Sequence, residues 1–170
     1  MNPSFNAPQF LHAINHLDAT LLIIGAETNF PRKDPRSNIP LLTSLIPNLA
    51  GSAIDSELVP SLKNVVLVNN ARGRIELDEF RTLGRYENVM EDGERDSALE
   101  DQGLDPHDAI NIQFTSGTTS MPKAACLSHR NILNNGKFIG DRMLLTTNDI
   151  VCCPPPLFQS VPLPLSPSDI

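Results

Sequence analysis

Two strand-like runs, each preceded by a helix-like run, constrain the fold of this chain most. Thr20–Gly25 (TLLIIG) follows the segment QFLHAINHL, in which apolar residues recur at helical spacing. Asn64–Asn69 (NVVLVN) is a second, β-branched run, and Ile39–Leu49 before it is apolar enough for a short helix despite two prolines. This alternation of helices and strands favours a parallel sheet. We therefore predict an α/β fold, a mostly parallel sheet with flanking helices.

The next two segments are expected to be a short helix and a surface connector. In Glu76–Gly84 (ELDEFRTLG) the apolar residues share one helical face, and the final glycine can close the helix. Residues 87–108 hold nine acidic residues against one basic residue, so mutual repulsion and hydration should keep them at the surface. No spacing singles out a pair of these carboxylates for metal binding or acid/base chemistry. We interpret residues 87–108 as an acidic connector.

A strand, a loop, a second strand and a helix are expected after residue 108. Ile110, Ile112 and Phe114 alternate along AINIQF as on one face of a strand, and AACL is typical of another strand. Ser128 is a candidate N-cap for the helix that follows. Residues 151–158 (VCCPPPLF) indicate a brief strand stopped by prolines. Residues 159–170 are expected to form a proline-rich, disordered tail.

Charge, the lengths of apolar segments and metal-ligand spacing limit the possible binding partners and the cellular compartment. A formal net charge of -7 opposes general polyanion binding, so no nucleic acid is expected as a partner. No stretch approaches the ~20 apolar residues of a membrane span. Neither a signal peptide nor an SKL-type peroxisomal tripeptide is found, and three cysteines without CxxC spacing fit a reducing compartment. We expect an intracellular, cytosolic protein. His12 and His16 have a zinc-binding spacing but no HExxH glutamate, so we interpret them as a surface pair.

The segment TSGTTSMPK, within residues 115–124, is the candidate phosphate-binding loop. Five hydroxyl residues and one glycine precede a proline and Lys123. Hydroxyl and backbone N–H groups donate to phosphate oxygens, glycine lets the backbone approach closely, and an ammonium group supplies a counter-charge. The GxxxxGK[ST] spacing of a Walker A loop is missing. The residues alone leave two interpretations open, a polyphosphate-binding loop and a plain Ser/Thr/Gly loop.

The longer stretch INIQFTSGTTSMPKAACLSHRNILNN resembles the phosphate-loop signature of the AMP-binding family of adenylate-forming synthetases and ligases. The chain is most similar to medium-chain and fungal acyl-CoA synthetases, roughly over residues 2–158. The resemblance implies that residues 1–158 form part of the large N-terminal adenylation domain. It also implies ATP-dependent activation of a carboxylic (fatty) acid to an acyl-adenylate and then to an acyl-CoA. ATP, entering with Mg²⁺ as substrate, and CoA are the expected small-molecule partners.

The resemblance carries phosphate-binding roles onto six residues and leaves no side chain as a catalytic nucleophile. The residues that would line the β- and γ-phosphates of ATP are Thr115, Ser116, Gly117, Thr118, Thr119 and Lys123. Two glycines common in the family pattern are replaced, by Ser120 and Ala124, and both changes restrict φ if the loop needs positive values. Gln159 stands where family members usually carry a histidine.

The extent of the chain gives a second hypothesis. Full family members are several times longer, and motifs that contact adenine and ribose are not found here. We therefore expect a truncated chain, and the alternative function is a catalytically inactive nucleotide-binding or interaction fragment. Residues that choose the acid are expected beyond Ile170. An exposed apolar sheet edge would favour pairing with another chain.

Overall fold

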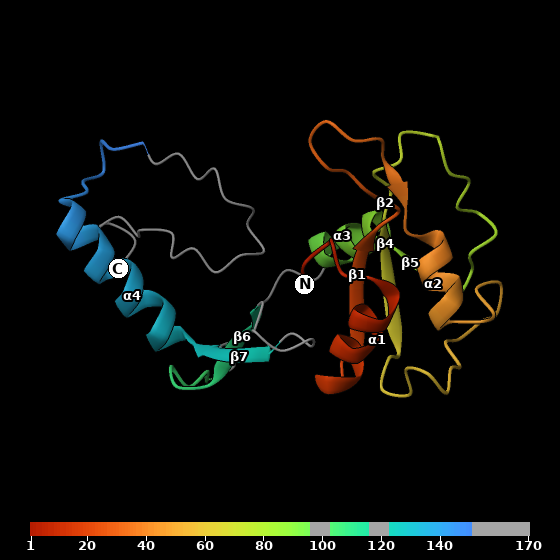
Figure 1. Cartoon of the computed structure of the whole chain (residues 1–170), viewed down its shortest axis with the longest axis horizontal. Coiled ribbons are helices and arrows are strands. Elements are labelled where there is room, and N and C mark those ends of the chain that lie inside the picture. The colour runs from red at the N-terminus through yellow and green to blue at the C-terminus, as the bar shows by residue number, and fades with distance from the viewer. Residues whose placement is uncertain (96–102, 116–122, 151–170) are drawn as a thin grey trace. The chain divides into compact units, whose positions relative to one another are not determined.

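The computed structural model describes residues 1–95, 103–115 and 123–150 of the 170-residue chain (Figure 1). The chain divides into two compact units, Phe5–Leu99 and a second one that joins Met1–Ser4 with Glu100–Ile170. The strand predicted at residues 151–158 and the tail at 159–170 lie outside the described residues.

A three-stranded parallel sheet forms the centre of the first unit. Its strands are β1 (Leu21–Gly25), β4 (Asn64–Val68) and β5 (Gly84–Arg85), in the order β1-β4-β5. β1 and β4 pair in register from Leu21↔Asn64 to Gly25↔Val68. The predicted α/β class with a parallel sheet is confirmed, and both long strands lie where the β-branched runs place them.

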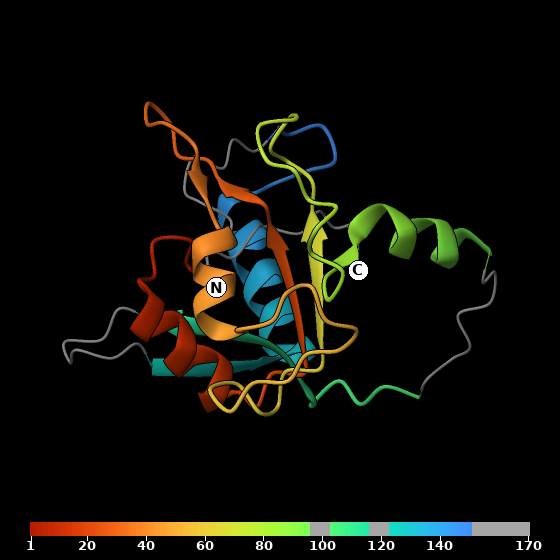
Figure 2. The same ribbon diagram turned by 90° about the vertical axis from the view of Figure 1, so that its right-hand side faces the viewer.

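Two helices cover one face of this sheet and bury its core. α1 (Ala7–His16) and α2 (Ile39–Leu45) lie on the same side of β1 and β4 (Figures 1 and 2). α2 ends earlier than the sequence predicts because Ile46 precedes a proline and takes an extended backbone, φ -125° and ψ 96°. The core side chains that these elements share include Phe10, Ile14, Leu22, Leu42, Leu45, Ile46, Val65 and Leu67.

The opposite face of β1 is exposed, although a continuous apolar run such as TLLIIG is typical of a buried strand. Leu22 is buried, whereas Leu21 and Ile23 are 51% and 56% exposed. Successive strand side chains point to opposite faces, so the continuous apolar run concealed an alternating pattern of burial. α3 (Tyr86–Arg95) lies on this second side of the sheet, toward β5 (Figure 2).

The prediction of a helix at Glu76–Gly84 is wrong. Residues 76–83 form successive turns, with Phe80 N–H donating to Leu77 O and Leu83 N–H donating to Phe80 O, and β5 begins at Gly84. Thr82 ties these turns to the loop after α2, because its hydroxyl lies 3.1 Å from Asn48 O. Long-range bonds therefore override a local helical pattern. The helix of the acidic stretch is α3, which the sequence did not predict.

A short hairpin stands at the carboxyl end of β1. β2 (Glu27–Thr28) pairs antiparallel with β3 (Arg36–Ser37), and residues 29–35 form the loop between them. Ala26 N–H donates to Val68 O at the end of β4, and Asn38 N–H donates to Ala26 O. The hairpin is thus anchored at the edge of the sheet where the parallel strands end.

The second unit contains a larger hairpin followed directly by a helix. β6 (Ala109–Thr115) and β7 (Lys123–Ser128) pair antiparallel, and α4 (His129–Met143) begins at the next residue. The predicted order of strand, loop, strand and helix is confirmed. These two strands pair with each other in a separate antiparallel sheet, so the parallel arrangement does not extend to them among the described residues.

Candidate phosphate-binding site

The hairpin of β6 and β7 brings the two ends of the predicted phosphate loop together. Thr115, the last residue of β6, pairs directly with Lys123, the first residue of β7. The next pair along is Phe114 with Ala124. Residues 116–122 connect the two strands, so the chain leaves and re-enters the sheet at one point.

Two of the six predicted phosphate-binding residues are placed by the structure. Thr115 and Lys123 form the neck of the loop, and the Lys123 side chain is exposed. Ser116, Gly117, Thr118 and Thr119 lie outside the described residues. The phosphate-binding role of all six residues therefore stays a prediction.

Ala124 fits its position without backbone strain. It lies within β7, opposite Phe114, and is absent from the described residues that have a positive φ. A β-strand accepts a Cβ at this position, so the replacement of the family's usual glycine by Ala124 does not distort the neck of the loop. Ser120, the other replaced glycine, lies outside the described residues.

α4 starts at the predicted N-cap and fixes the far end of β7. The Ser128 hydroxyl accepts a hydrogen bond from Asn131 N–H, and the Asn131 side chain accepts one from Ser128 N–H at 3.0 Å. This reciprocal pair satisfies two backbone donors at the start of the helix. Leu144 caps the C-terminus of the helix, and its left-handed backbone (φ 54°) lets Leu145 N–H donate to Gly140 O.

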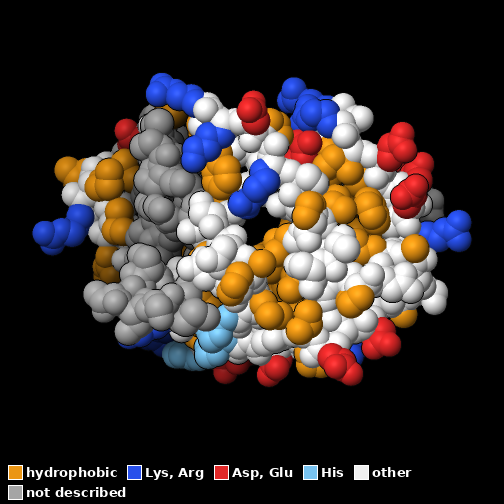
Figure 3. All heavy atoms as spheres, turned by 45° about the vertical axis from the view of Figure 1, so that its right-hand side comes forward, with side chains coloured by type: hydrophobic (Ala, Val, Ile, Leu, Met, Phe, Trp, Pro, Cys, Tyr) orange, Lys and Arg blue, Asp and Glu red, His pale blue; other side chains and the backbone are white. Residues whose placement is uncertain are grey.

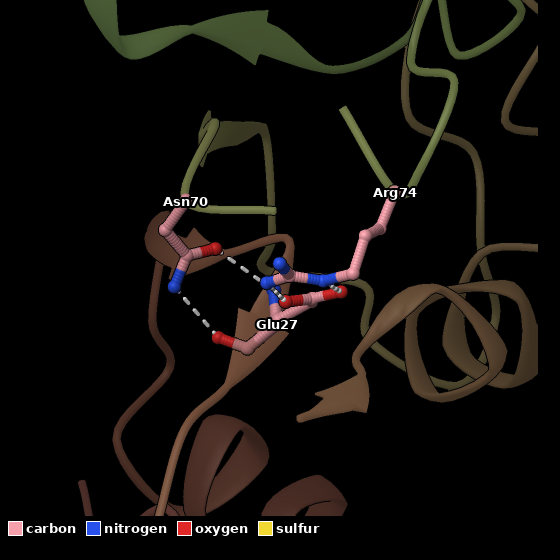
Figure 4. Close-up of polar contacts among 3 residues, drawn as sticks. All are labelled: Glu27, Asn70 and Arg74. Atoms are coloured by element: carbon pink, nitrogen blue, oxygen red, sulfur yellow. Dashed lines mark hydrogen bonds and ion pairs between the residues drawn. The ribbon is translucent and has the colours of Figure 1, made fainter. Parts of the chain in front are cut away.

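A second polar centre lies at the carboxyl ends of β1 and β4 (Figure 4). The buried Glu27 carboxylate receives two hydrogen bonds from the Arg74 guanidinium, one of them from Nε at 3.1 Å. The Asn70 side chain accepts from Glu27 N–H at 2.9 Å and donates to Glu27 O at 2.8 Å. Glu27 of β2 and two residues of the loop after β4 thus bind one another through both side chain and backbone.

Glycine is required where this network approaches the end of β1. A Cβ added to Gly25 would lie 2.8 Å from the Asn70 amide nitrogen and 2.9 Å from the Glu27 carbonyl oxygen. Buried Asn38 also donates to Gly25 O at 2.9 Å. The network therefore packs directly against the backbone of Gly25, where any side chain would clash.

Arg74 controls the ionisation of Glu27. The paired guanidinium lowers the pKa of the Glu27 carboxyl through its hydrogen bonds, against the opposing effect of burial. The same interaction raises the pKa of Arg74. No local sequence pattern predicts this network. A useful signal would have been the polar residues, Glu27 and Asn70, that follow directly after two parallel strands.

The described residues offer no alternative metal centre. His12 and His16 stack with their ring centroids 5.5 Å apart and their planes 13° from parallel. Parallel, stacked rings do not direct nitrogen lone pairs at one point. No group of three or more His, Cys, Asp or Glu residues in the described ranges could hold a metal ion. No helix within those ranges is long and apolar enough to cross a membrane.

Comparison with known proteins identifies a family and several ligases. Residues 1–163 match the family model described as AMP-binding enzyme. The chain is 36% identical to the acyl-CoA ligase sidI of Aspergillus fumigatus, an alignment that covers 94% of this chain and 25% of that protein. It is 33% identical to the mitochondrial medium-chain acyl-CoA ligase ACSF2 of Bos taurus, covering 85% of this chain and 23% of the relative. The expected cytosolic location stays a prediction.

A solved structure shares the fold of this chain. The acetoacetyl-CoA synthetase from Streptomyces lividans matches with a TM-score of 0.60 at 18% sequence identity, over 86% of this chain and 20% of that protein. At this identity the likeness concerns the fold alone. The chain spans about a quarter of the length of the curated relatives it matches.

Proposed function

Because this chain belongs to the AMP-binding enzyme family, we propose that it supplies the ATP phosphate-binding part of an acyl-CoA synthetase. The observation that carries this proposal is the paired neck of the loop, Thr115 opposite Lys123, within a segment that matches the family. The relatives named acyl-CoA ligases support a carboxylic acid as the substrate and CoA as the acceptor. The nucleotide enters as ATP with Mg²⁺.

The proposed chemistry requires electrostatic stabilisation and no protein nucleophile. A carboxylate oxygen of the acid attacks the α-phosphorus of ATP, the bond to the bridging oxygen breaks, and pyrophosphate leaves with the electron pair. Hydroxyl and backbone N–H groups of residues 115–119 would donate to the oxygens of the β- and γ-phosphates, and Lys123 would add a positive charge. Charge builds on the departing pyrophosphate, so these donors lower the barrier.

The second half-reaction would transfer the acyl group to CoA. The CoA sulfur attacks the carbonyl carbon of the acyl-adenylate, and AMP leaves with the electrons of the mixed anhydride bond. A fatty acid is the proposed acid class, in line with the medium-chain designation of one relative.

Acid-dependent exchange of labelled pyrophosphate into ATP tests this function on the purified chain. Exchange that requires a fatty acid supports catalysis by this chain. ATP binding without exchange supports the alternative, a catalytically inactive nucleotide-binding or interaction fragment.

Replacement of Lys123 tests the phosphate-binding role of the loop, whether or not the chain catalyses exchange. Lys123→Ala removes one charge-assisted contact, so ATP affinity should fall roughly tenfold to a hundredfold, from ~1.5–3 kcal/mol for such a bond. Lys137→Ala is a matched control, because Lys137 lies in α4 with an exposed side chain 3.5 Å from Asp141. Equal ATP affinity of Lys123→Ala and wild type, measured by calorimetry, would show that the loop assignment is wrong.

A further inference from the structure

One edge of the parallel sheet carries several cations, together with Asp34 and with Glu27, whose carboxylate pairs with Arg74. Five of its 13 Lys and Arg residues lie in the β2–β3 hairpin and in the loop after β4. We call this set the basic edge, and it consists of Arg32, Lys33, Arg36, Arg72 and Arg74. Both loops follow strands that end at the same side of the sheet. The hydrogen bonds between Glu27 and the pair Asn70 and Arg74 hold them together.

Two arginines of the basic edge occupy backbone positions that usually belong to glycine or asparagine. Lys33 N–H donates to Phe30 O across a turn whose third residue, Arg32, has a φ of 62°. Arg74 N–H donates to Ala71 O across a second turn, in which Arg72 has a φ of 50° and Gly73 a φ of 81°. Left-handed backbone strains any residue with a Cβ, and bulky side chains are uncommon there.

Both turn tips carry an arginine in spite of this conformational cost. Glycine or asparagine would form either turn at lower conformational cost. Strained backbone of this kind is held in place by the surrounding structure and is often found at functional sites. Arg32 and Arg72 share a positive charge on a long side chain, and both are exposed.

The basic edge has the form of a rim. The two loops project beyond the end of the sheet in Figure 1, and the upper part of Figure 3 shows Lys and Arg side chains with some Asp and Glu side chains among them. All five residues of the basic edge are exposed. Apolar groups accompany them, since the Lys33 ammonium lies 5.8 Å from the centre of the Phe30 ring and Pro31 is exposed beside it. Cations on projecting tips suit a flat anionic surface, whereas a small anion needs donors that converge in a concavity.

We propose that the basic edge docks this domain onto an anionic membrane surface. Each Lys or Arg near such a surface is attracted by its negative potential, and the attraction decays within a Debye length. The net charge of -7 makes the remaining surface repulsive, so the chain would approach a membrane with this edge first. Phe30 and Pro31 would enter the headgroup region alongside the cations. This interaction goes beyond the proposed function and places the domain where apolar acids accumulate.

Vesicle sedimentation with the whole chain tests the proposal without ATP or an acid, so its outcome is independent of the adenylation chemistry. The chain should sediment with vesicles of phosphatidylcholine and phosphatidylserine, not with phosphatidylcholine alone, and added NaCl should release it. Arg32→Asn combined with Arg72→Asn should lower the partition coefficient by about tenfold or more. Asparagine tolerates left-handed backbone, so the double variant should melt no lower than wild type.

Lys63→Asn is the matched control, because exposed Lys63 precedes β4 at the opposite end of the same strand. This variant should keep wild-type vesicle binding. Equal binding to neutral vesicles, or an equal loss in Lys63→Asn, would overturn the proposal. Displacement from vesicles by stoichiometric inorganic pyrophosphate would also overturn it, and would assign the basic edge to a soluble phosphate ligand.

Discussion

At the scale of single residues, the Glu27–Arg74 pair links protonation to the stability of the first unit. The Glu27 carboxylate is buried, while the Arg74 side chain is 47% exposed. Their interaction holds the pKa of Glu27 below its ordinary value of 4.5. The unfolded chain therefore binds more protons than the folded chain over the range between the two pKa values.

Stability should fall as the pH drops through that range. The contribution of the pair is complete above the ordinary pKa of Glu27 and is lost as the carboxyl is protonated in the folded protein. Arg74→Met should flatten this acid dependence and destabilise the chain at pH 7, because it leaves a buried carboxylate without its cation. Urea denaturation of both proteins between pH 3 and 7 measures the effect. If the free energy of unfolding of Arg74→Met fell at low pH as much as that of the wild type, the proposed link between the pair and acid stability would be wrong.

A pair of glycine substitutions tests how closely the network packs. Gly25→Ala should destabilise the chain by roughly 1–3 kcal/mol, because the new Cβ meets both Asn70 and the Glu27 carbonyl. Gly93→Ala, in α3, has no atom within 4 Å of the added Cβ and should stabilise by roughly 0.5–1 kcal/mol. Thermal or chemical unfolding checks the opposite signs. Equal effects of the two substitutions would show that the contact at Gly25 is not constrained.

At the scale of helices and strands, burial follows the two-residue period of β1. Leu22 is 6% exposed and Leu21 51% exposed, although the two residues are chemically identical neighbours. Leu22→Ala should cost about 2–5 kcal/mol through the cavity it leaves against α1 and α2. Leu21→Ala should cost far less, within about 1 kcal/mol, because its side chain already contacts solvent. Similar losses in unfolding free energy would mean that the face with Leu21 is covered.

Sequence patterns predicted the elements whose local signals are complete. α1, β1, β4, β6, β7 and α4 lie where periodicity and capping residues place them, and Ser128 caps α4 as expected. β5 was missed because two residues, Gly84 and Arg85, carry no strand pattern and form a strand only through pairing with β4. α3 was missed because repulsion among its acids dominated the interpretation.

The polar residues of the two sites also differ in whether a local sequence pattern predicts them. Thr115 and Lys123 could be assigned from a local motif, and the strand pairing that joins them follows from the two apolar runs beside the loop. The Glu27–Arg74 pair spans 47 positions and Asn70 lies 43 from Glu27, so no local pattern connects them. Their proximity depends on the parallel register of β1 and β4, which sequence periodicity does not specify.

At the scale of the whole molecule, two separate hairpins would serve two functions, nucleotide binding and membrane docking. The β6–β7 hairpin presents a nucleotide loop, and the β2–β3 hairpin presents a cationic rim. Many apolar side chains are exposed in the described residues, among them Phe138 at 64% and Ile112 at 40%. Such surfaces are typical of interfaces with further protein.

Amide chemical-shift mapping with an ATP analogue tests the central claim most directly. The isotope-labelled chain is titrated with a non-hydrolysable ATP analogue and Mg²⁺, and each backbone N–H signal is followed. We predict the largest shifts at residues 115–121 and at residue 123, small shifts at the ends of β1 and β4, and loss of the loop shifts in Lys123→Ala. Saturable shifts that fall elsewhere, with residues 115–123 unchanged, would contradict the assignment of this loop to the phosphates of ATP.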